Sequence, residues 1–448
     1  MCHLFLIKAT RKRTVLCLLI FRPSGLKRTV LCLPIFQSPG LLRSISLNSH
    51  RLRNKTDMKK ENLEKITQLR HELHMYPELS MQESGTLKII RQFLRENTSL
   101  QVADCGGWCY AVKRGTTGKA DSGLLLNVHY VQSGEKNGRQ GRKKTAFRAD
   151  MDALPIMEKD DLPYHSRNRG VSHKCGHDGH CAALCGLALE LDQMETEKDV
   201  YLIFQPGEET GRGALLCRDL LKKEGISEIF AFHNLGGFPE NSMVFRDGLT
   251  QPASEGLEMH FSGKTSHASA PGEGINPAEV IAKTVLFARD LAGRVKEGMA
   301  LCTVTGIGLG TGDFGISPGE GRLCLTLRAE YEAEMKRMEK DLLDYARGLS
   351  EPLGIRFSYA IRDYFPETRN DSRSLIRIRE AAQKAGLQTI PMDRMWRASE
   401  DFGWYLKECP GAMVYIGNGE IYPALHTEEY DFNDRILETA VDLFLELV

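Results

Sequence analysis

Apolar and polar residues alternate along the chain with two different periods, and these periods predict its secondary structure. Residues 59–74 and 84–96 place apolar side chains three or four positions apart, as one face of an α-helix does. Between residues 97 and 254 the chain then alternates short apolar runs with helical segments. We predict strands over 123–131, 144–154, 199–209 and 228–236, and helices over 181–194 and 213–225. Such alternation indicates an α/β domain with a largely parallel sheet.

A different order of elements begins near residue 255. It reads as strand, helix, two strands, helix and strand, which is the order of an α+β unit. The segments are 257–268, 276–295, 301–310, 321–331, 332–354 and 355–363. From residue 366 the α/β pattern returns, with a helix at 373–386 and a strand at 411–419. We therefore predict a catalytic α/β domain in two parts, 58–254 and 366–448, interrupted by an inserted α+β domain at 255–365.

The first 57 residues differ from the rest in charge. They hold eleven Lys or Arg and one acid, Asp57, so residues 58–448 carry 59 − 11 = 48 basic and 59 − 1 = 58 acidic residues. They also contain a repeat, RTVLCLLIFRPSGL at 13–26 and RTVLCLPIFQSPGL at 28–41. A basic, acid-poor leader can be an organelle-targeting peptide. We expect that residues 1–57 are not part of the fold.

Composition excludes several classes of function. The 59 basic and 59 acidic residues of the 448 balance to a net charge of zero, whereas a nucleic-acid-binding protein usually has a basic excess. The mean hydropathy is −0.31, and the apolar runs are far shorter than the roughly 20 residues of a membrane span. Twelve cysteines in so long a chain are too few for a disulfide scaffold. We expect a cytoplasmic protein that has neither a nucleic-acid nor a membrane partner.

Residues suited to metal chemistry follow the predicted strands. Open α/β sheets bind ligands at the carboxyl ends of their strands. The residues at such ends are Asp150, Asp152, Glu208, Glu209, His233 and His426, and the segment HKCGHDGH at 173–180 precedes a helix. Cysteine, histidine and carboxylate are the ligands of zinc and related ions. Gly176 lets the chain turn tightly between Cys175 and His177.

A structural zinc site at Cys175, His177 and His180 is the main alternative. Structural zinc sites are closed by four nitrogen or sulfur ligands. Against this reading, Glu208 and Glu209 are adjacent acids that would be costly to bury unless a metal or protons engaged them. Neighbouring carboxylates suit divided roles, in which one binds metal and the other remains free as a base.

Seven motifs, taken together, resemble one family. They are LRHELHMYPELSMQE (69–83), FRADMDALPI (147–156), HKCGHDGH (173–180), FQPGEETGRGA (204–214), SGKTSHASAP (262–271), SEDFGWYL (399–406) and LHTEEYDFND (425–434). In order and spacing, this series is similar to the amidohydrolase branch of the aminoacylase-like metallopeptidases. That branch includes hippurate hydrolases, auxin-conjugate hydrolases and N-acetyldiaminopimelate deacetylases. The resemblance covers about residues 58–448; Gly207 and Thr210-Gly211 depart from the usual Ala and Gly-Gly.

The resemblance implies roles for particular residues. Two divalent ions (Zn, Mn, Co or Ni) per subunit would be held by Cys175, His177, Glu209, His233 and His426. Glu208 would be the general base, and Asp150 would orient a metal ligand. The inserted domain would be a ferredoxin-like lid that mediates dimerisation, and its His267 would reach the partner's active site. Asn276 and Arg328 are candidates for binding a substrate carboxylate.

The function implied is hydrolysis of the amide bond of N-acyl or N-aroyl amino acids. A metal-bridged water, activated by Glu208, would attack the amide carbonyl and yield a carboxylic acid and a free amino acid. Two alternatives remain open. One is a dipeptidase or aminopeptidase on the same scaffold, and the other is a non-catalytic binding protein stabilised by metal. The expected partners are a small acylated amino acid and a second copy of the chain.

Overall fold

The computed structural model describes residues 2–7, 15–20, 30–34, 58–116, 143–159 and 161–448. The chain divides into two units, Met1–Thr56 and Asp57–Val448. In the first unit, β1 (Cys2–Ile7), β2 (Val15–Ile20) and β3 (Val30–Pro34) form an antiparallel sheet. The two copies of the repeat supply β2 and β3, which pair with each other. The strand predicted at 123–131 falls outside the described residues.

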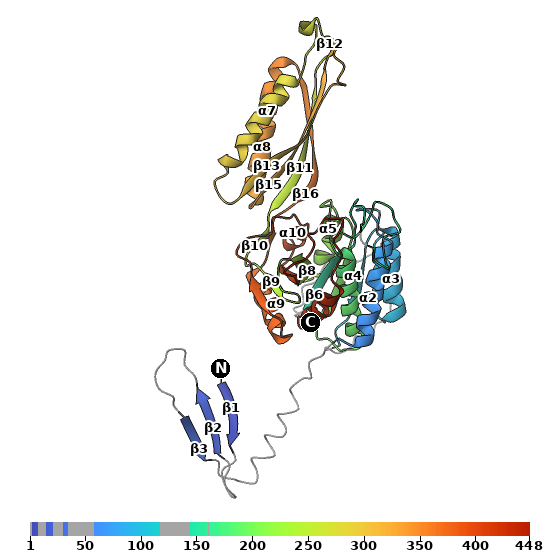
Figure 1. The fold of residues 1–448 in the computed structure, drawn as a ribbon, viewed down its shortest axis with the longest axis vertical. Coiled ribbons are helices and arrows are strands. Elements are labelled where there is room, and N and C mark those ends of the chain that lie inside the picture. Colours follow the sequence, from blue (N-terminus) through green and yellow to red (C-terminus); the bar gives the residue numbers. More distant parts are fainter. Residues whose placement is uncertain (1, 8–14, 21–29, 35–57, 117–142, 160) are drawn as a thin grey trace, which may run out of the picture. The chain divides into compact units, whose positions relative to one another are not determined.

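The larger sheet of the second unit is parallel at its centre, as predicted (Figure 1). Its four central strands are mutually parallel, with β8 pairing β19 on one side and β6 on the other. They are β19 (Gly411–Gly419), β8 (Glu228–Gly236), β6 (Lys144–Asp150) and β7 (Asp199–Gln205). Outside these lie β9 (Met243–Phe245) and β18 (Thr389–Pro391) on one side, and β5 (Cys109–Lys113) and β4 (Gln101–Asp104) on the other. The carboxyl ends of the central strands therefore meet at one edge.

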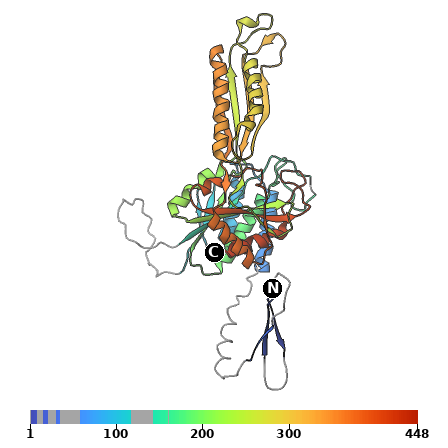
Figure 2. The same cartoon turned by 90° about the vertical axis from the view of Figure 1, so that its left-hand side faces the viewer.

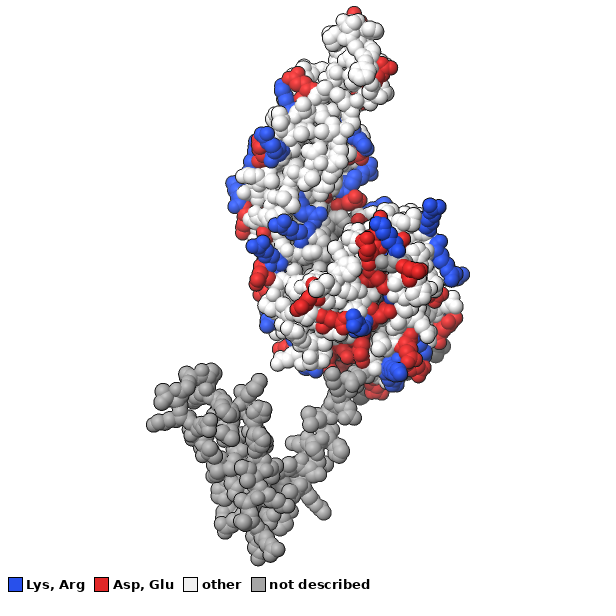
Figure 3. All heavy atoms as spheres, in the orientation of Figure 1, with Lys and Arg blue, Asp and Glu red and all other residues white. Residues whose placement is uncertain are grey.

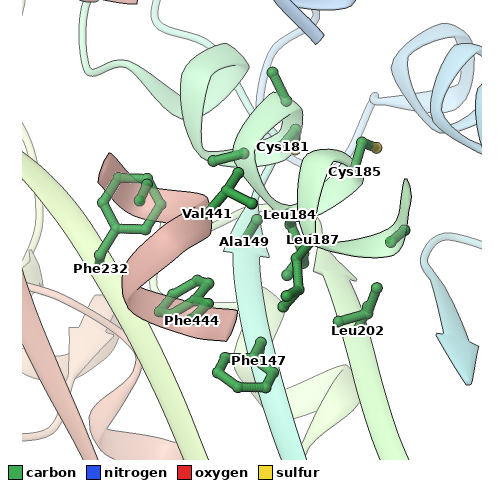
Figure 4. Packing of buried hydrophobic residues seen from close by; sticks show 14 of the residues in the cluster. Phe147, Ala149, Cys181, Leu184, Cys185, Leu187, Leu202, Phe232, Val441 and Phe444 are labelled. Atoms are coloured by element: carbon green, nitrogen blue, oxygen red, sulfur yellow. The ribbon is translucent and has the colours of Figure 1, made fainter. Parts of the chain in front are cut away.

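Helix α4 (His177–Asp192) is buried almost throughout, because its apolar sequence packs against other elements on several sides. Figure 4 shows Leu184 and Leu187 facing Phe147 and Ala149 of β6. The helices that contact it are α2 (Lys60–Met75), α3 (Ser84–Asn97) and α11 (Leu437–Leu445). The prediction placed its start at residue 181, which is wrong by four residues. His177, Asp178 and His180 are polar and so escape an apolar pattern, but each is buried in the helix with a polar partner.

A second, antiparallel sheet lies between residues 253 and 365 (Figures 1 and 2). Its strand order is β13 (Ala300–Leu309), β15 (Glu320–Ala329), β11 (Ala253–Ser262) and β16 (Arg356–Phe365). Helices α7 (Ala278–Leu291) and α8 (Glu332–Ser350) pack side by side on it and close a separate apolar core. Alternate residues of β11 and β15 enter this core, as expected for a sheet with one covered face.

Two predicted elements are each divided in the structure. The strand predicted over 257–268 ends at Ser262, and β12 (Ser266–His267) pairs instead with β14 (Ile316–Ser317). At Gly263 a Cβ atom would lie 2.1 Å from the carbonyl oxygen of Ile275, so the chain turns where another segment crosses closely. The helix predicted over 213–225 is α5 (Gly213–Cys217) followed by α6 (Asp219–Glu224).

The remaining described elements are short or lie near the carboxyl end. They are β10 (Leu249–Gln251), β17 (Thr368–Arg369), α9 (Ser372–Lys384) and α10 (Gly403–Leu406), with 3-10 turns at Pro271–Glu273, Ala292–Arg294, Glu351–Leu353 and Asp434–Ile436. On the face drawn in Figure 3, basic and acidic side chains are interspersed over the described part. None of the helices described here combines the length and apolar character that a membrane span needs.

Candidate metal centre and active site

The structure brings together residues from four separate segments at the carboxyl edge of the parallel strands. Among the described residues, candidate ligand atoms lie within 4.8 Å of one another in five groups; one is Asp150, His177 and His180, another is Glu208, Glu400 and Asp401, and the other three join these segments. These three are Cys175, His177 and His233; Cys175, Glu209 and His426; and His177, Glu208 and Glu209. We call the five residues Cys175, His177, Glu209, His233 and His426 the ligand group. Glu208 lies beside it, so the structure brings together Glu208, Glu209, His233 and His426, which follow predicted strands, with Cys175 and His177 of the segment before α4.

The turn that presents Cys175 and His177 depends on Gly176. Its φ is +97°, in the left-handed region that glycine adopts without strain. A Cβ atom there would lie 2.4 Å from the Asn234 side-chain oxygen and 2.9 Å from the Tyr430 hydroxyl. No larger residue fits without moving these neighbours, so the tight turn inferred from the sequence is observed.

Both buried histidines of the ligand group have one ring nitrogen engaged behind the site. The Nδ1–H of His177 donates to the Asp152 carbonyl at 2.9 Å, and that of His233 to the Asn234 carbonyl at 2.8 Å. Each Nε2 is thereby free to act as an acceptor toward the group. Metal-binding histidines are typically oriented by such a bond on the other nitrogen.

Unpaired atoms inside the ligand group fit a divalent cation. Among the described residues, His177 Nε2 and Glu209 Oε1 are buried without a hydrogen-bond partner. The sulfur of Cys175 lies 3.4 Å from His233 Nε2 and 3.3 Å from His426 Nε2. Burying the His177 nitrogen and the Glu209 oxygen without partners is costly, and a bound cation would remove that cost. Nitrogen, thiolate and carboxylate together are a ligand set that suits zinc and related metals.

The structural zinc site considered from sequence does not match the contacts of His180. Its Nδ1 lies 2.6 Å from Asp150 Oδ1, and its Nε2 lies 2.7 Å from the Asn234 side-chain oxygen. Both ring nitrogens are therefore engaged with protein oxygens. His180 supports Asp150 and Asn234, and the ligand group is completed by His233 on β8 and by Glu209 and His426 in turns.

Asp150 lies behind the ligand group. One of its oxygens contacts His180, and the other accepts a bond from Arg148 Nη1 at 2.7 Å and lies 3.7 Å from His177 Nε2. It is fully buried. Its position suits holding His177 and His180 in place.

Sequence reasoning assigned no role to Asp152, which the structure shows to be the anchor of the Glu208–Glu209 loop. Its two carboxylate oxygens accept the backbone N–H groups of Glu208 and Glu209 at 3.0 and 2.9 Å. Ser80 donates to the same carboxylate at 2.7 Å. Glu83 accepts the N–H of Gly207 at 2.7 Å. Asp152 lies in the motif at 147–156 and Glu83 in the motif at 69–83, so membership in these motifs could have indicated both residues.

The buried guanidinium of Arg148 lies near Glu208. Arg148 pairs with Asp150 at 2.7 Å, Glu400 at 3.0 Å and Asp401 at 2.8 Å. The ligand atoms of Glu208, Glu400 and Asp401 also lie within 4.8 Å of one another. Burial, together with the charges of Glu400 and Glu209, raises the pKa of Glu208 well above its ordinary value. A carboxyl group in this state is suited to hold a proton.

Another buried network supports the helix that begins at His177. His74 contacts Asp178 and Glu158, each at 2.8 Å, and Lys174 donates to Glu158 at 2.7 Å. Arg70 pairs with Asp178 on the same side. Burial lowers the pKa of His74, but its bonds to the two carboxylates outweigh burial and raise it to about 9. The network holds the segment that carries Cys175 and His177.

A cavity of about 690 Å³ opens onto the ligand group. Four of the five group members and Glu208 line it, together with Arg328 and an apolar wall that includes Leu235, Phe365, Trp396 and Tyr422. The ring of Trp396 meets that of His233 edge-on, with centroids 5.2 Å apart. Such a pocket can hold a small molecule with apolar and polar ends.

His267 and Asn276, both predicted site residues, do not line this cavity. His267 is exposed on β12, where its ring contacts Ser269, and Figure 1 places β12 at the end of the antiparallel sheet away from the parallel one. Asn276 lies near it and donates to Ser317 at 3.3 Å, while its oxygen accepts the N–H of Ala278 at the start of α7. Only Arg328, of the three residues predicted in the inserted segment, lines the cavity.

Comparison with known proteins agrees with this geometry. The model of "Peptidase family M20/M25/M40" matches residues 146–448. The chain is 28% identical over 388 residues to an N-acetylcysteine deacetylase of Bacillus subtilis, covering 86% of this chain and 96% of that protein. It is 28% identical over 387 residues to a hippurate hydrolase of Campylobacter jejuni, covering 85% and 94%.

A solved structure is similar along nearly its whole length. It is a dinuclear metal binding peptidase of the M20 family from Bacillus subtilis, with a TM-score of 0.69 and 26% identity, covering 87% of this chain and 98% of that one. The family match extends over more than half of the chain. The chain belongs to the peptidase family M20/M25/M40.

Proposed function

We propose that the chain is a metal-dependent amidohydrolase that cleaves N-acyl or N-aroyl amino acids into a carboxylic acid and a free amino acid. As a member of this peptidase family, it is a hydrolase that acts on amide bonds. One observation carries the finer proposal. Glu208 is buried at the cavity wall, directly beside the ligand group, with its pKa raised.

The ligand group would hold two divalent ions. Cys175, His177, Glu209, His233 and His426 supply sulfur, nitrogen and oxygen donors, a mixed set that accepts Zn, Mn, Co or Ni. When bound, such ions polarise a carbonyl and lower the pKa of water toward neutrality. The dinuclear peptidase of Bacillus subtilis has the same fold, which supports two ions here.

Glu208 would act as the proton carrier of the reaction. It accepts a proton from the attacking water and later passes it to the leaving amine. The Asp152 carboxylate holds the backbone of Glu208 and Glu209, so the two side chains keep their separate directions. Asp150, anchored by Arg148, lies 3.7 Å from His177 Nε2 and would orient that ring toward the ions.

We also propose the domain division 58–254, 255–365 and 366–448, with the middle segment acting as a lid and dimerisation domain. The edge strand β13 exposes Leu301, Ile307 and Leu309. Unpaired edge strands with apolar side chains favour pairing with another chain. His267 lies on the same segment and, in a dimer, could stabilise the oxyanion in the partner's site.

Complementation tests the dimer. Glu208→Gln protein and His267→Ala protein should each be inactive, yet a mixed dimer contains one site with both residues intact. Activity should partly return after subunit exchange, which fluorescence transfer between labelled chains can verify. Exchange without recovery would show that His267 does not act in the partner's site. Asn276 stays a prediction, since within one chain it contacts only local residues.

A hydrolysis screen tests the activity itself. Apoprotein is supplied in turn with Zn, Mn, Co or Ni and offered N-acetyl, N-benzoyl and indole-acetyl amino acids. We expect cleavage of acylated amino acids and rejection of dipeptides with a free α-amine. A carboxypeptidase of Saccharolobus solfataricus is 28% identical over 388 residues, so a peptidase is the second candidate. Preference for unblocked peptides would favour it.

The cytoplasm remains our proposed location. Nine cysteines among the described residues are free, which fits a reducing compartment. Fractionation of cells that express the full chain would test this.

A further inference from the structure

Two arginines from distant segments line the cavity beyond the ligand group. Arg328 is on β15, and Arg397 is in the loop between β18 and α10. A guanidinium N–H of Arg328 donates to the backbone carbonyl of Arg397. This bond holds the two positions next to each other, although 69 residues separate them in the chain.

Among the described residues, Arg328 has no acidic partner, unlike the buried Arg70 and Arg148. Arg70 pairs with Asp178, Asp431 and Asp434, and Arg148 likewise with three carboxylates. In the described part of the chain, neither Arg328 nor Arg397 forms an ion pair with a carboxylate. A partly buried guanidinium without a counter-charge is costly.

The pKa of Arg328 reflects this lack of a counter-charge. Burial lowers its pKa, and no neighbouring acid offsets the shift. Arg328 is partly buried while Arg397 is exposed, so the pair extends from the cavity wall toward its mouth. An anion bound there would meet one guanidinium that is already partly desolvated and a second that lines the same cavity.

Charge in the cavity is thus divided between two regions. Glu208, Glu209 and Glu400 lie at or beside the ligand group, whereas the lining cations are Arg328 and Arg397. The apolar wall, with Trp396 and Phe365, lines the same space. A substrate whose amide bond lies at the ligand group could therefore place its anionic end near the two arginines and its apolar acyl group against the apolar wall.

We propose that Arg397 binds the substrate's carboxylate together with Arg328 and so determines specificity for acylated amino acids over neutral amides. The inference rests on the proposed function, because it assumes that an acylated amino acid occupies the cavity. Arg328 alone was a candidate from the sequence. Arg397 had no predicted role although it lies just before the motif at 399–406, because only the structure brings it next to Arg328.

The test compares N-benzoylglycine with N-benzoylglycinamide, which differ at one group, an anionic carboxylate in the first and a neutral carboxamide in the second. Binding is measured by calorimetry on metal-loaded Glu208→Gln protein, so that turnover does not interfere. Arg397→Ala should weaken binding of the acid by about 10- to 100-fold and leave binding of the amide unchanged within about twofold. Arg397→Lys should recover part of the loss, because it keeps the charge but not the forked donor geometry.

A matched control is available in the same loop. Arg394 is exposed and lies outside the cavity lining, so Arg394→Ala should bind both probes as the parent does. An equal loss for acid and amide on Arg397→Ala, or no loss for the acid, would overturn the role of Arg397. Turnover by the protein with Glu208 intact is measured separately. Absence of hydrolysis of any acylated amino acid there would overturn the proposed function, whatever the binding result.

Discussion

Replacing Asp152 by Asn tests how far the catalytic loop depends on a single buried carboxylate. The substitution keeps the size of the side chain and removes its charge. In the parent, the carboxylate accepts bonds from the backbone N–H groups of Glu208 and Glu209 and from the Ser80 hydroxyl, at 3.0, 2.9 and 2.7 Å. An Asn side chain has one acceptor oxygen and one NH₂ group. Whichever way the amide turns, one of the two backbone N–H groups then faces a donor.

The expected cost follows from these bonds. A buried donor left without its acceptor costs about 1–3 kcal/mol. The surviving backbone bond also loses its charge assistance, and charged hydrogen bonds contribute about 1 kcal/mol more than neutral ones. We expect the free energy of unfolding to fall by about 2–4 kcal/mol. Because the loop carries Glu209, metal affinity should fall by about 10- to 100-fold, as it does when groups that orient ligands are lost.

Two measurements check the expectation. Urea unfolding of apoprotein gives the stability change without a contribution from metal, and calorimetric titration gives metal affinity. Ser80→Ala is the matched control, since it removes one bond from the same carboxylate but keeps the charge. It should cost about 1 kcal/mol and leave metal affinity nearly unchanged. Full metal affinity in Asp152→Asn would refute the view that this carboxylate holds the ligand loop.

Four further predictions concern the site and its support. Cys175→Ser should lower metal content, measured by atomic emission, while circular dichroism stays unchanged, because a hydroxyl is a poor replacement for a thiolate. Glu208→Gln should keep its metal and lose several orders of magnitude in kcat, whereas Glu209→Gln should lose metal; a reversal would exchange their roles. The folded pKa of His74 of about 9 exceeds its unfolded value near 6.5, so its contribution to stability is complete below pH ~6.5 and lost as pH rises through about 9. Urea unfolding between pH 6 and 10 should show this decline in the parent and a smaller one in His74→Gln. Removal of residues 1–57 should leave an active enzyme, as measured by hydrolysis of acylated amino acids; loss of folding would contradict it.

Much of the fold followed from periodicity because the relevant signals are local. The amphipathic spacing of α2 and α3 and the apolar runs of β7 and β8 identify those elements without knowledge of their neighbours. The grouping of the strand-end residues followed from topology, since the carboxyl ends of adjacent parallel strands share one edge.

Contacts between distant segments were not predictable in the same way. The division of the strand at Gly263 results from the approach of Ile275, which no local pattern reveals. Arg148 is a charged residue inside an apolar strand, and its partner Asp401 lies 253 residues away. The sequence displays both charges but not their pairing, because pairing depends on how β6 and the loop before α10 meet.

Adjacent carboxylates show most clearly where sequence reasoning ends. Glu208 and Glu209 have the same chemistry and share one anchor in Asp152, so nothing local distinguishes them. Their side-chain neighbours do. Glu209 lies with Cys175 and His426 in a group of potential metal ligands, and its Oε1 is 3.4 Å from His426 Nε2. Both acids lie 3.9 Å from His177 Nε2, but Glu208 also lies against Glu400, and burial together with the negative charge of Glu400 opposes ionisation of Glu208 and favours proton uptake. A metal ligand must give up its proton and a general base must be able to take one, so we propose that the difference in surroundings, more than residue type, divides the two roles.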